Sequence, residues 1–386
     1  MHRLLPWRSG QVGVLLRFLL ALGLVEFARS GLYAGLLPLV APERLGLNLG
    51  VVGVAVSLHY LGDTFGRSFG GYLSDRFGVG WVVGTGALVG LAVVLWVPEA
   101  KVGGLLWGLA LLHGLAIMPM WPGVMTLASR ASKPGADARS IGLAHMLLAP
   151  FIGLGALATA YFADTRPRTA FTLVLGAQAI AAVLALSVLR VRGEARPAPP
   201  TRPRYPWGRL VSLFPAAFAQ TLAPGLLAPI LFPFAKYAGL SPLWVGLVIA
   251  VGGLVAYGLL QPAGRLADRY GPKWPLIVGI SLNAITLLLL ARMPPLPLYL
   301  LIAALGGLGY ALMVPSWGGL VVRTLPEHNR AAAWGALMTF EGLGFAVGPA
   351  LGGLAWTALG VTAPFELGAS VYLIVALFYL IYLRRR

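Results

Sequence analysis

The stretch GYLSDRFG at residues 71–78 returns as GRLADRYG at residues 264–271. Its two aspartates, Asp75 and Asp268, stand 193 positions apart in a chain of 386 residues. A phrase that repeats at half the chain length indicates two similar halves. Each copy follows one long apolar run and precedes another, so we predict that each copy is a tight charged turn between two helices.

Composition predicts that those helices lie in a membrane. Apolar residues make up 58% of the chain and charged residues 11%, whereas soluble domains contain about 25% charged residues. Runs of about 20 apolar residues, each long enough to cross a bilayer, fill nearly the whole sequence. They cover residues 12–40, 46–70, 79–97, 101–128, 139–163, 167–191, 209–235, 242–263, 274–292, 296–323, 331–358 and 363–383.

The fold class follows from what a backbone can do in lipid. A helical bundle is expected because lipid offers backbone polar groups no other partner, and the strand-like alternation of a membrane barrel is absent. We therefore predict an all-α membrane protein with 12 transmembrane helices in two pseudo-symmetric six-helix bundles. The bundles are expected at residues 1–192 and 209–386, joined by the cytoplasmic, proline-rich linker GEARPAPPTRPRYPWG at 193–208.

The placement of basic residues predicts the orientation. We place 20 of the 29 lysines and arginines on one side and six on the other, which puts both termini in the cytoplasm. The net charge of +17 is spread over short loops, so anionic lipid headgroups explain it better than nucleic acid does. The chain has no cysteine, and its histidines lack metal-ligand spacing, so we expect neither a disulfide nor a metal site.

Three of the 12 acidic residues, Glu26, Asp63 and Glu341, fall inside apolar spans. A charge at the bilayer centre costs at least about 2.5–3.5 kcal/mol, so such residues are expected to face a partner or a water-filled cavity. Glu26 and Arg29 are three residues apart and share a helix face, and Tyr33 continues that face one turn further on. This face is the first part of a predicted binding site.

Two further polar stripes complete the predicted site. His59, Asp63 and Arg67 recur every four residues on the second helix, while His113 and Trp121 lie eight residues apart on the fourth. Three polar stripes that converge on one cavity are typical of a binding site. The candidates for substrate binding and proton coupling are Glu26, Arg29, Tyr33, His59, Asp63, Trp121 and Glu341.

Structural roles stay open for these side chains. The alternatives are an ion pair that only offsets its own burial for Glu26 and Arg29, a hydrogen bond to a neighbouring helix for Asp63 or Glu341, a snorkelling cation for Arg67 and a core aromatic for Trp121. Glycines in the run 342–353 equally fit bending at a gate and close helix packing.

The repeated phrase has an expected role of its own. Asp75 and Asp268 end the second and eighth helices, where an acid can cap the N-terminus of a facing helix. Arg76 and Arg269 can pair across the two halves and latch the cytoplasmic side when the cavity opens outward. We therefore predict a gating role for all four residues, with purely topogenic charge as the alternative.

The duplicated phrase, the hydropathy of six plus six spans and the glycine-rich eleventh helix resemble the major facilitator superfamily over the whole chain. A narrower resemblance is carried by Glu26-Phe27-Ala28-Arg29, His59, Asp63, Pro119-Met120-Trp121, Leu213-Phe214-Pro215 and Pro315-Ser316-Trp317. These motifs are similar to those of bacterial flippases that move the diglucosyl-diacylglycerol anchor of lipoteichoic acid. The sequence departs from that family near Leu147 and Leu148, where the family has a second cavity tryptophan. Its first Asp-Arg turn is also complete, whereas the family's is degenerate.

The resemblance implies a proton-coupled antiporter that works by alternating access in the bacterial cytoplasmic membrane. It implies a polar headgroup cavity in the N-terminal half, in which Glu26, Arg29 and Asp63 carry the chemistry, and a more apolar C-terminal half. We accordingly expect a monomeric flippase whose partners are a lipid or glycolipid, protons and the bilayer, with no cofactor and the proton gradient as energy source. Spacing favours Asp63 as proton carrier, because Asp63 is further from a fixed cation than Glu26 is. The resemblance favours Glu26 with equal weight, so both residues remain candidates.

Other function classes fit less well. A proton-coupled exporter of multiple drugs or small hydrophobic molecules is the alternative, because an acidic cavity suits cationic drugs, although Arg29 disfavours them. An enzyme is not expected, since no clustered nucleophile or acid–base pair is legible. A channel is disfavoured by the duplicated gating phrase.

Overall fold

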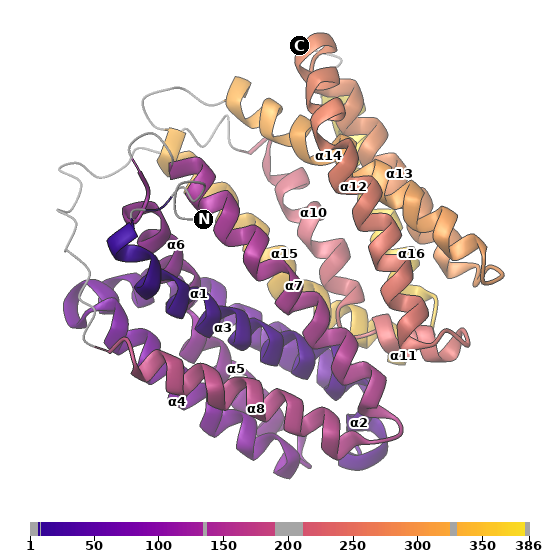
Figure 1. Ribbon diagram of the computed structural model, residues 1–386. Coiled ribbons are helices and arrows are strands. Elements are labelled where there is room, and N and C mark those ends of the chain that lie inside the picture. The colour runs from indigo at the N-terminus through magenta and orange to yellow at the C-terminus, as the bar shows by residue number, and fades with distance from the viewer. Residues whose placement is uncertain (1–6, 8, 134–136, 190–210, 325–329, 383–386) are drawn as a thin grey trace. The chain divides into compact units, whose positions relative to one another are not determined.

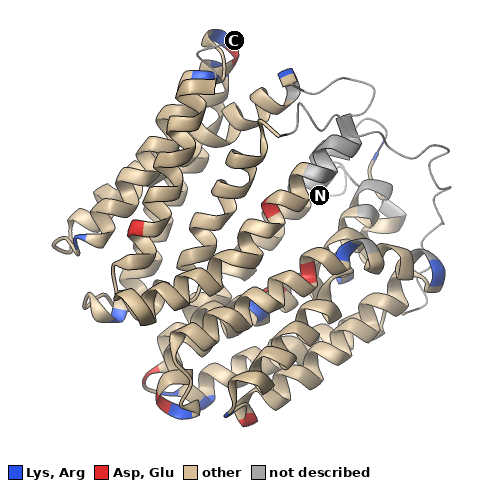
Figure 2. Cartoon of the chain, turned by 180° about the vertical axis from the view of Figure 1, so that it is seen from behind, with Lys and Arg blue, Asp and Glu red and all other residues tan. Residues whose placement is uncertain are grey.

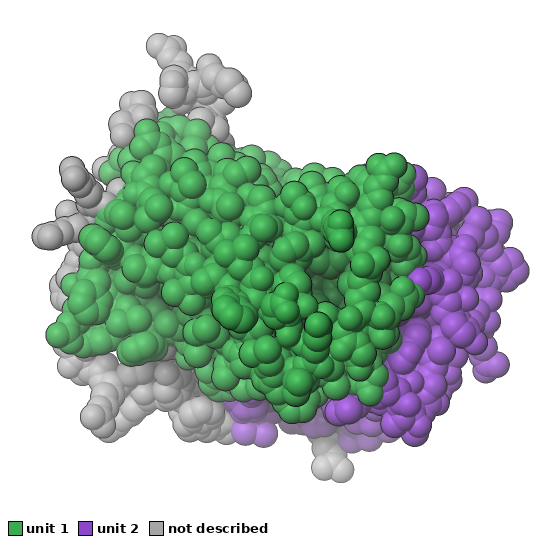
Figure 3. Space-filling view, turned by 90° about the horizontal axis from the view of Figure 1, so that it is seen from below, with its two compact units in different colours: residues 1–198 green, residues 199–386 purple. Residues whose placement is uncertain are grey.

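A computed structural model describes residues 7, 9–133, 137–189, 211–324 and 330–382 (Figure 1). Contacts divide the chain into two units, Met1–Ala198 and Pro199–Arg386, which Figure 3 colours separately. Within the described ranges the chain is almost entirely helical, with one isolated β-bridge between Trp7 and Ser132 and no strand. The predicted all-α membrane fold is confirmed. The predicted linker 193–208 lies outside the described residues, and the predicted domain boundaries stay a prediction.

Among its described residues, the first unit has one long interrupted helix and six further helices. Its elements are α1 (Ser9–Ser30), the π-helical turn η1 (Gly31–Leu36), α2 (Leu37–Val40), a second π-helical turn η2 (Ala41–Leu45), α3 (Leu49–Phe77), α4 (Val79–Trp96), the 3-10 turn η3 (Val97–Glu99), α5 (Gly103–Ile117), α6 (Met120–Arg130), α7 (Asp137–Ala163) and α8 (Pro167–Leu186). Elements α1 to η2 form a single candidate span, Gln11–Leu45. Pro119 separates α5 from α6 because proline has no N–H to donate to a helix.

The second unit holds α10 (Phe214–Leu227), α11 (Leu231–Tyr237), α12 (Pro242–Tyr270), α13 (Lys273–Ala291), α14 (Leu298–Thr324), α15 (Arg330–Leu359) and α16 (Ala363–Tyr382). Across the described residues of both units, 11 helices are long and apolar enough to cross a membrane. The number rises to 12 if α10 and α11, bent by 48° at the break that contains Pro229, form one span. These spans agree with the predicted 12-helix architecture.

The repeat seen in the sequence is also a repeat of structure. Helix α12 begins and ends 193 residues after α3 does, and both are 29 residues long. Asn48 caps α3 by accepting the N–H of Val51 at 3.0 Å, and Ser241 caps α12 by accepting the N–H of Trp244 at 3.3 Å. Helices α8 and α16 are also equal in length, at 20 residues, and begin 196 residues apart. These two pairs of helices therefore repeat in length, and the first pair also repeats its N-terminal capping.

The repeated phrase is not the tight turn that we predicted. Residues 71–77 continue α3 and residues 264–270 continue α12, so only the final glycine of each copy leaves the helix. Gly78 has φ 93° and Gly271 has φ 88°, a region that residues with a Cβ rarely adopt. The preceding residues have no such restriction and remain helical. Asp75 and Asp268 thus lie in the last helical turn, and the chain reverses at the glycine.

Close helix contacts fix the positions of the polar stripes. Helix α3 packs on α5, and α10 packs on α15. A Cβ at Gly114 of α5 would collide with the carbonyl of His59 on α3, so glycine is needed for that approach. Gly344 and Gly352 of α15 fit against the backbone of α10 in the same way. The glycine-rich run of α15 is therefore a packing surface in this structure.

Candidate functional site

The strongest candidate site is a cluster around Glu26 in the first unit. Glu26 lies on α1 with only 1% of its surface exposed, deep among apolar side chains. Arg29, one turn further along α1, donates to Glu26 Oε2 through Nε at 3.0 Å and also through Nη2. Its remaining terminal nitrogen, Nη1, donates to the hydroxyl of Tyr60 on α3 at 2.7 Å. Trp121 on α6 donates from Nε1 to Glu26 Oε1 at 2.8 Å.

These four residues, Glu26, Arg29, Tyr60 and Trp121, are called the N-terminal acid cluster below. They join α1, α3 and α6, and both oxygens of the carboxylate have a donor. Figure 2 shows that most charged residues lie near the ends of helices, with a few inside them. A buried ion pair is stable only when such hydrogen bonds satisfy both partners, and the cluster meets that requirement. Sequence spacing correctly paired Glu26 with Arg29 and brought Trp121 to the same site.

Asp63 pairs with an arginine of its own helix. It lies on α3, 5% exposed, and its Oδ2 accepts a hydrogen bond from Arg67 Nη2 at 2.6 Å. The premise that Asp63 stands far from a fixed cation is therefore wrong, since Arg67 lies one helical turn away. Arg67 is more exposed than Asp63, with 43% of its side chain accessible, so this pair is less secluded than Glu26–Arg29.

Tyr33, His59 and His113 form a second group within the same unit. The Tyr33 hydroxyl lies 3.1 Å from His113 Nδ1, and the rings of Tyr33 and His59 contact each other with 4.4 Å between centroids and 35° between their planes. The two histidine rings are 5.0 Å apart, and both side chains are fully buried. Tyr33 sits on the π-helical turn η1, which begins two residues after Arg29. Such turns alter which face a side chain occupies and are frequent at functional sites.

Several polar atoms near these rings have no protein partner. Both ring nitrogens of His59 and Nε2 of His113 lack a hydrogen-bond partner. Gln178 on α8 is fully buried as well; it donates to the Ala87 carbonyl at 3.2 Å, while its own Oε1 has no partner. Buried groups of this kind usually bind ordered water or take part in function.

The second unit has an acid site of its own. Glu341 on α15 is half-buried, and its Oε1 accepts from Gln220 Nε2 at 2.5 Å and from Trp317 Nε1 at 3.3 Å. The hydroxyl of Thr221 donates to the backbone oxygen of Glu341 at 2.6 Å. Gln220, Trp317 and Glu341 are called the C-terminal acid cluster below. Within the described part of the second unit, no ion pair reaches Glu341.

The tryptophan of the repeated Pro-x-Trp motif donates a hydrogen bond to a glutamate in both units. Trp121 and Trp317 are 196 positions apart in the sequence, and each gives its indole N–H to a carboxylate inside its own bundle. The acids themselves are on different helices, Glu26 on α1 and Glu341 on α15. The motif match was visible in the sequence, but the carboxylate that each tryptophan contacts was not.

The predicted gating residues lie at the ends of α3 and α12. Arg76 is exposed and donates to the Tyr72 hydroxyl at 3.1 Å, while the Arg269 guanidinium lies 5.2 Å from the centre of the Tyr270 ring. Asp268 is exposed, and the side chain of Asp75 lies outside the described residues. Each described arginine therefore contacts an aromatic ring of its own helix, and the gating role stays a prediction.

Sequence reasoning missed three residues of these sites. Tyr60 was overlooked although it lies three residues before Asp63 on a polar face. Gln178 is an amide in the middle of an apolar run, which is a signal in itself. The contact of Gln220 with Glu341 joins residues 121 positions apart and had no local signal. In the described residues no group of three potential ligands is placed to hold a metal ion.

Comparison with known proteins adds the family. The family model described as Major Facilitator Superfamily matches residues 18–212 and again residues 213–386. The proton-coupled antiporter flippase LtaA of Staphylococcus saprophyticus is 25% identical over 379 residues, which are 94% of this chain and 93% of that protein. The protein of the same description from Staphylococcus aureus is 24% identical over 376 residues, covering 94% and 92%.

Solved transporter structures share the fold. The nucleoside transporter NupG superimposes with a TM-score of 0.74 at 15% identity, covering 95% of this chain and 99% of that one. A peptide transporter of the POT type in complex with sulfate gives a TM-score of 0.72 at 16% identity, with coverage of 96% and 94%. At these identities the likeness concerns the fold.

Proposed function

The chain belongs to the Major Facilitator Superfamily of transporters, and we propose that it is a proton-coupled flippase of glycolipids. One observation carries the proposal, namely the N-terminal acid cluster, a carboxylate and a guanidinium held together inside an apolar bundle. A pair of apolar side chains would pack there at less cost. The flippases to which the chain is similar support the choice of lipid and of proton coupling.

The chemistry of the cluster suits a sugar headgroup. A carboxylate accepts hydrogen bonds from hydroxyl groups, and the guanidinium of Arg29 donates to their oxygens. Trp121 is only half-buried and adds an apolar ring face beside the same carboxylate. Hydroxyl-rich, uncharged headgroups therefore match the cluster, while a cationic drug would meet Arg29.

Exchange of lipid against protons follows if both compete for Glu26. Deprotonated Glu26 accepts hydrogen bonds from the headgroup; a proton arriving on it removes acceptor capacity and weakens headgroup binding. Thermodynamic linkage requires the reverse effect as well, so bound headgroup disfavours the proton to the same degree. A proton entering from outside then releases the lipid there, and the empty carrier returns with its proton.

The remaining parts of the proposal concern topology. We place the protein in a bacterial cytoplasmic membrane as a monomer, with both termini and the segment 193–208 in the cytoplasm, because basic residues are concentrated on that side. Asp75, Arg76, Asp268 and Arg269 would latch the cytoplasmic face between two bundles, 1–192 and 209–386. Alternating access of the two bundles is the expected mode of transport.

A flipping assay tests the function. The purified protein is reconstituted in liposomes that contain a fluorescent diglucosyl-diacylglycerol, and a pH gradient is imposed. We expect gradient-driven movement of the lipid by the wild type and by Glu99→Gln, a control that changes an exposed loop acid. We expect no gradient-driven movement by Glu26→Gln. Export of a cationic dye without movement of the glycolipid would instead establish the exporter of small hydrophobic molecules.

A further inference from the structure

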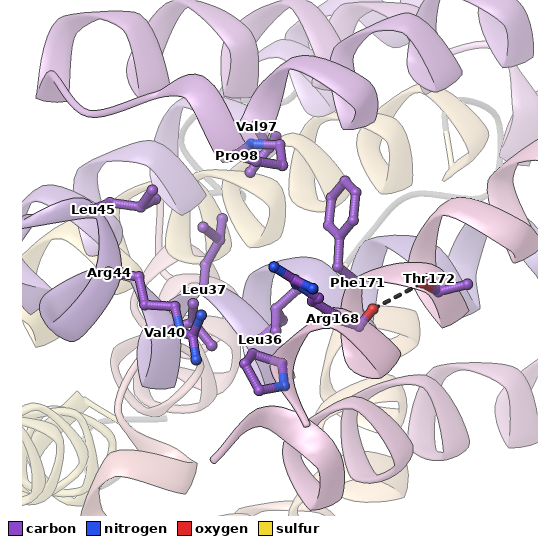
Figure 4. Close-up of a pocket in the computed structure, with 11 residues that line it drawn as sticks. Leu36, Leu37, Val40, Arg44, Leu45, Val97, Pro98, Arg168, Phe171 and Thr172 are labelled. Atoms are coloured by element: carbon purple, nitrogen blue, oxygen red, sulfur yellow. Dashed lines mark hydrogen bonds between the residues drawn. The ribbon is translucent and has the colours of Figure 1, made fainter. Parts of the chain in front are cut away.

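A pocket of about 440 Å³ lies at one end of the first unit, and its lining contains no residue of the N-terminal acid cluster. Its walls come from the end of the first span, from η3 and from the start of α8 (Figure 4). Most of the lining is apolar and includes Leu36, Leu37, Val40, Val97 and Phe171. The volume falls within the range of about 300–1,000 Å³ that small-molecule pockets have.

Two cations stand at this apolar pocket. Arg44 on η2 and Arg168 on α8 belong to its lining and are exposed, so both side chains are free to turn toward a ligand (Figure 4). Neither guanidinium pairs with an acid among the described residues. Glu43, Glu99 and Asp164 lie at the same end of the unit but do not line the pocket. The lining of the pocket therefore combines an apolar interior with two cationic side chains and contains no acid.

We propose that this pocket binds a phospholipid with an anionic headgroup. The phosphate is held between Arg44 and Arg168, because guanidinium groups form strong, charge-assisted hydrogen bonds with phosphate oxygens. An acyl chain covers the apolar wall formed by Leu37, Val40 and Phe171. Predicted topology puts these arginines at the exterior ends of their spans, which is the depth of the headgroups of the outer leaflet.

The lipid in this pocket is not the transported one. None of the residues of the N-terminal acid cluster lines the pocket, so the inference stands apart from the proposed function. A phosphate bound to both arginines joins η2 to α8. The π-helical end of the first span and the start of α8 are then held together by the lipid, and an occupied pocket stabilises this end of the unit.

Lipid titration of the full-length protein tests the inference. Purified protein in a neutral detergent is titrated with phosphatidylglycerol or phosphatidylcholine, and bound lipid is counted by native mass spectrometry. We expect the affinity for phosphatidylglycerol to fall about ten-fold or more in the double variant Arg44→Gln with Arg168→Gln, as expected for two lost charge-assisted hydrogen bonds. Arg166→Gln is the matched control, since Arg166 is exposed two residues from Arg168 but does not line the pocket; less than about a two-fold change is expected.

Three outcomes would overturn the inference. Equal affinity for phosphatidylcholine in the wild type would mean that the arginines do not select an anion. An equal loss of affinity for phosphatidylglycerol in Arg166→Gln would show that the general surface charge, and not the pocket, attracts the lipid. Full displacement of the lipid by inorganic phosphate would assign the site to a free anion. A variant with lysine at both positions checks the fold and the charge, and it should keep a preference for phosphatidylglycerol. Because the readout is binding without transport, failure here leaves the flipping assay unaffected.

Discussion

The two acid clusters share a tryptophan donor but differ in the charge of the other groups that contact the carboxylate. In the N-terminal cluster Glu26 is held by the guanidinium of Arg29 and by the indole of Trp121. In the C-terminal cluster Glu341 has an indole and an amide as donors and no arginine. An ionised Glu26 is therefore compensated by a full charge, whereas the donors that reach the Glu341 carboxylate within the described part of the second unit are uncharged dipoles. We therefore propose that protons and substrate are exchanged at the first unit, where the carboxylate has a charged partner.

The largest effect is expected from breaking the ion pair. Glu26→Gln leaves Arg29 as a buried cation without its counter-ion, and removal of one partner of a buried pair costs about 3–5 kcal/mol. We expect a clearly lower thermal midpoint together with loss of gradient-driven flipping. The double variant Glu26→Gln with Arg29→Gln should recover most of the midpoint but none of the transport. Recovery of transport in the double variant would show that the pair has only a structural role.

Asp63→Asn should separate transport from stability. With 43% of its side chain accessible, Arg67 can be solvated once the pair is lost, so this loss is expected to cost less than the roughly 3–5 kcal/mol of a fully buried pair. Gradient-driven flipping should nevertheless be abolished, while exchange of lipid without a gradient survives. Both rates are measured in the same liposomes. If Asp63→Asn flips lipid as the wild type does under a pH gradient, Asp63 has no part in coupling.

The two tryptophans offer a direct comparison between the units. Trp121→Phe removes the donor that Glu26 Oε1 has, and an unsatisfied buried group costs about 1–3 kcal/mol. Trp317→Phe should cost less, about 0.5–1.5 kcal/mol, because Gln220 still donates to the same oxygen of Glu341. Thermal unfolding of the two variants measures both costs. A larger loss of stability for Trp317→Phe than for Trp121→Phe would contradict the expectation that Glu26 depends more on its tryptophan than Glu341 does.

The smallest effect on substrate affinity is expected at the repeated phrase. Asp75→Asn and Asp268→Asn should leave glycolipid affinity largely unchanged and shift the conformational equilibrium away from the outward-open state. Distances between spin labels on the cytoplasmic face of the two bundles report that shift. Unchanged distance distributions in both variants would remove the gating role and leave topogenic charge.

Much of the architecture could be predicted because its signals are local. Apolar runs gave the spans, and the repeat of Gly71–Gly78 gave the two-fold organisation. The i, i+3 spacing of Glu26 and Arg29 predicted their ion pair, which the structure contains. The phrase around Asp75 was misread as a turn, because its charge suggested a loop while only Gly78 needed an unusual backbone conformation.

Contacts between helices were harder to predict than contacts along one helix. The bond of Tyr60 to Arg29 depends on how α1 and α3 rotate against each other, and the sequence contains no direct signal for that rotation. The partner of Glu341 depends in the same way on the close approach of α10 and α15, which Gly344 permits. Arg67 lies four residues after Asp63 on the same stripe, a spacing that permits the ion pair. Snorkelling was nevertheless the structural role that we expected for Arg67.

Proton release on headgroup binding tests the central claim most directly. Diglucosyl-diacylglycerol is added to the detergent-solubilised protein, and calorimetry in buffers of different ionisation enthalpy counts the protons that leave or enter. The claim that lipid and proton compete for Glu26 predicts proton release by the wild type and by Glu341→Gln, and none by Glu26→Gln. Undiminished release by Glu26→Gln, or its loss in Glu341→Gln alone, would contradict the claim and move coupling to the C-terminal acid cluster.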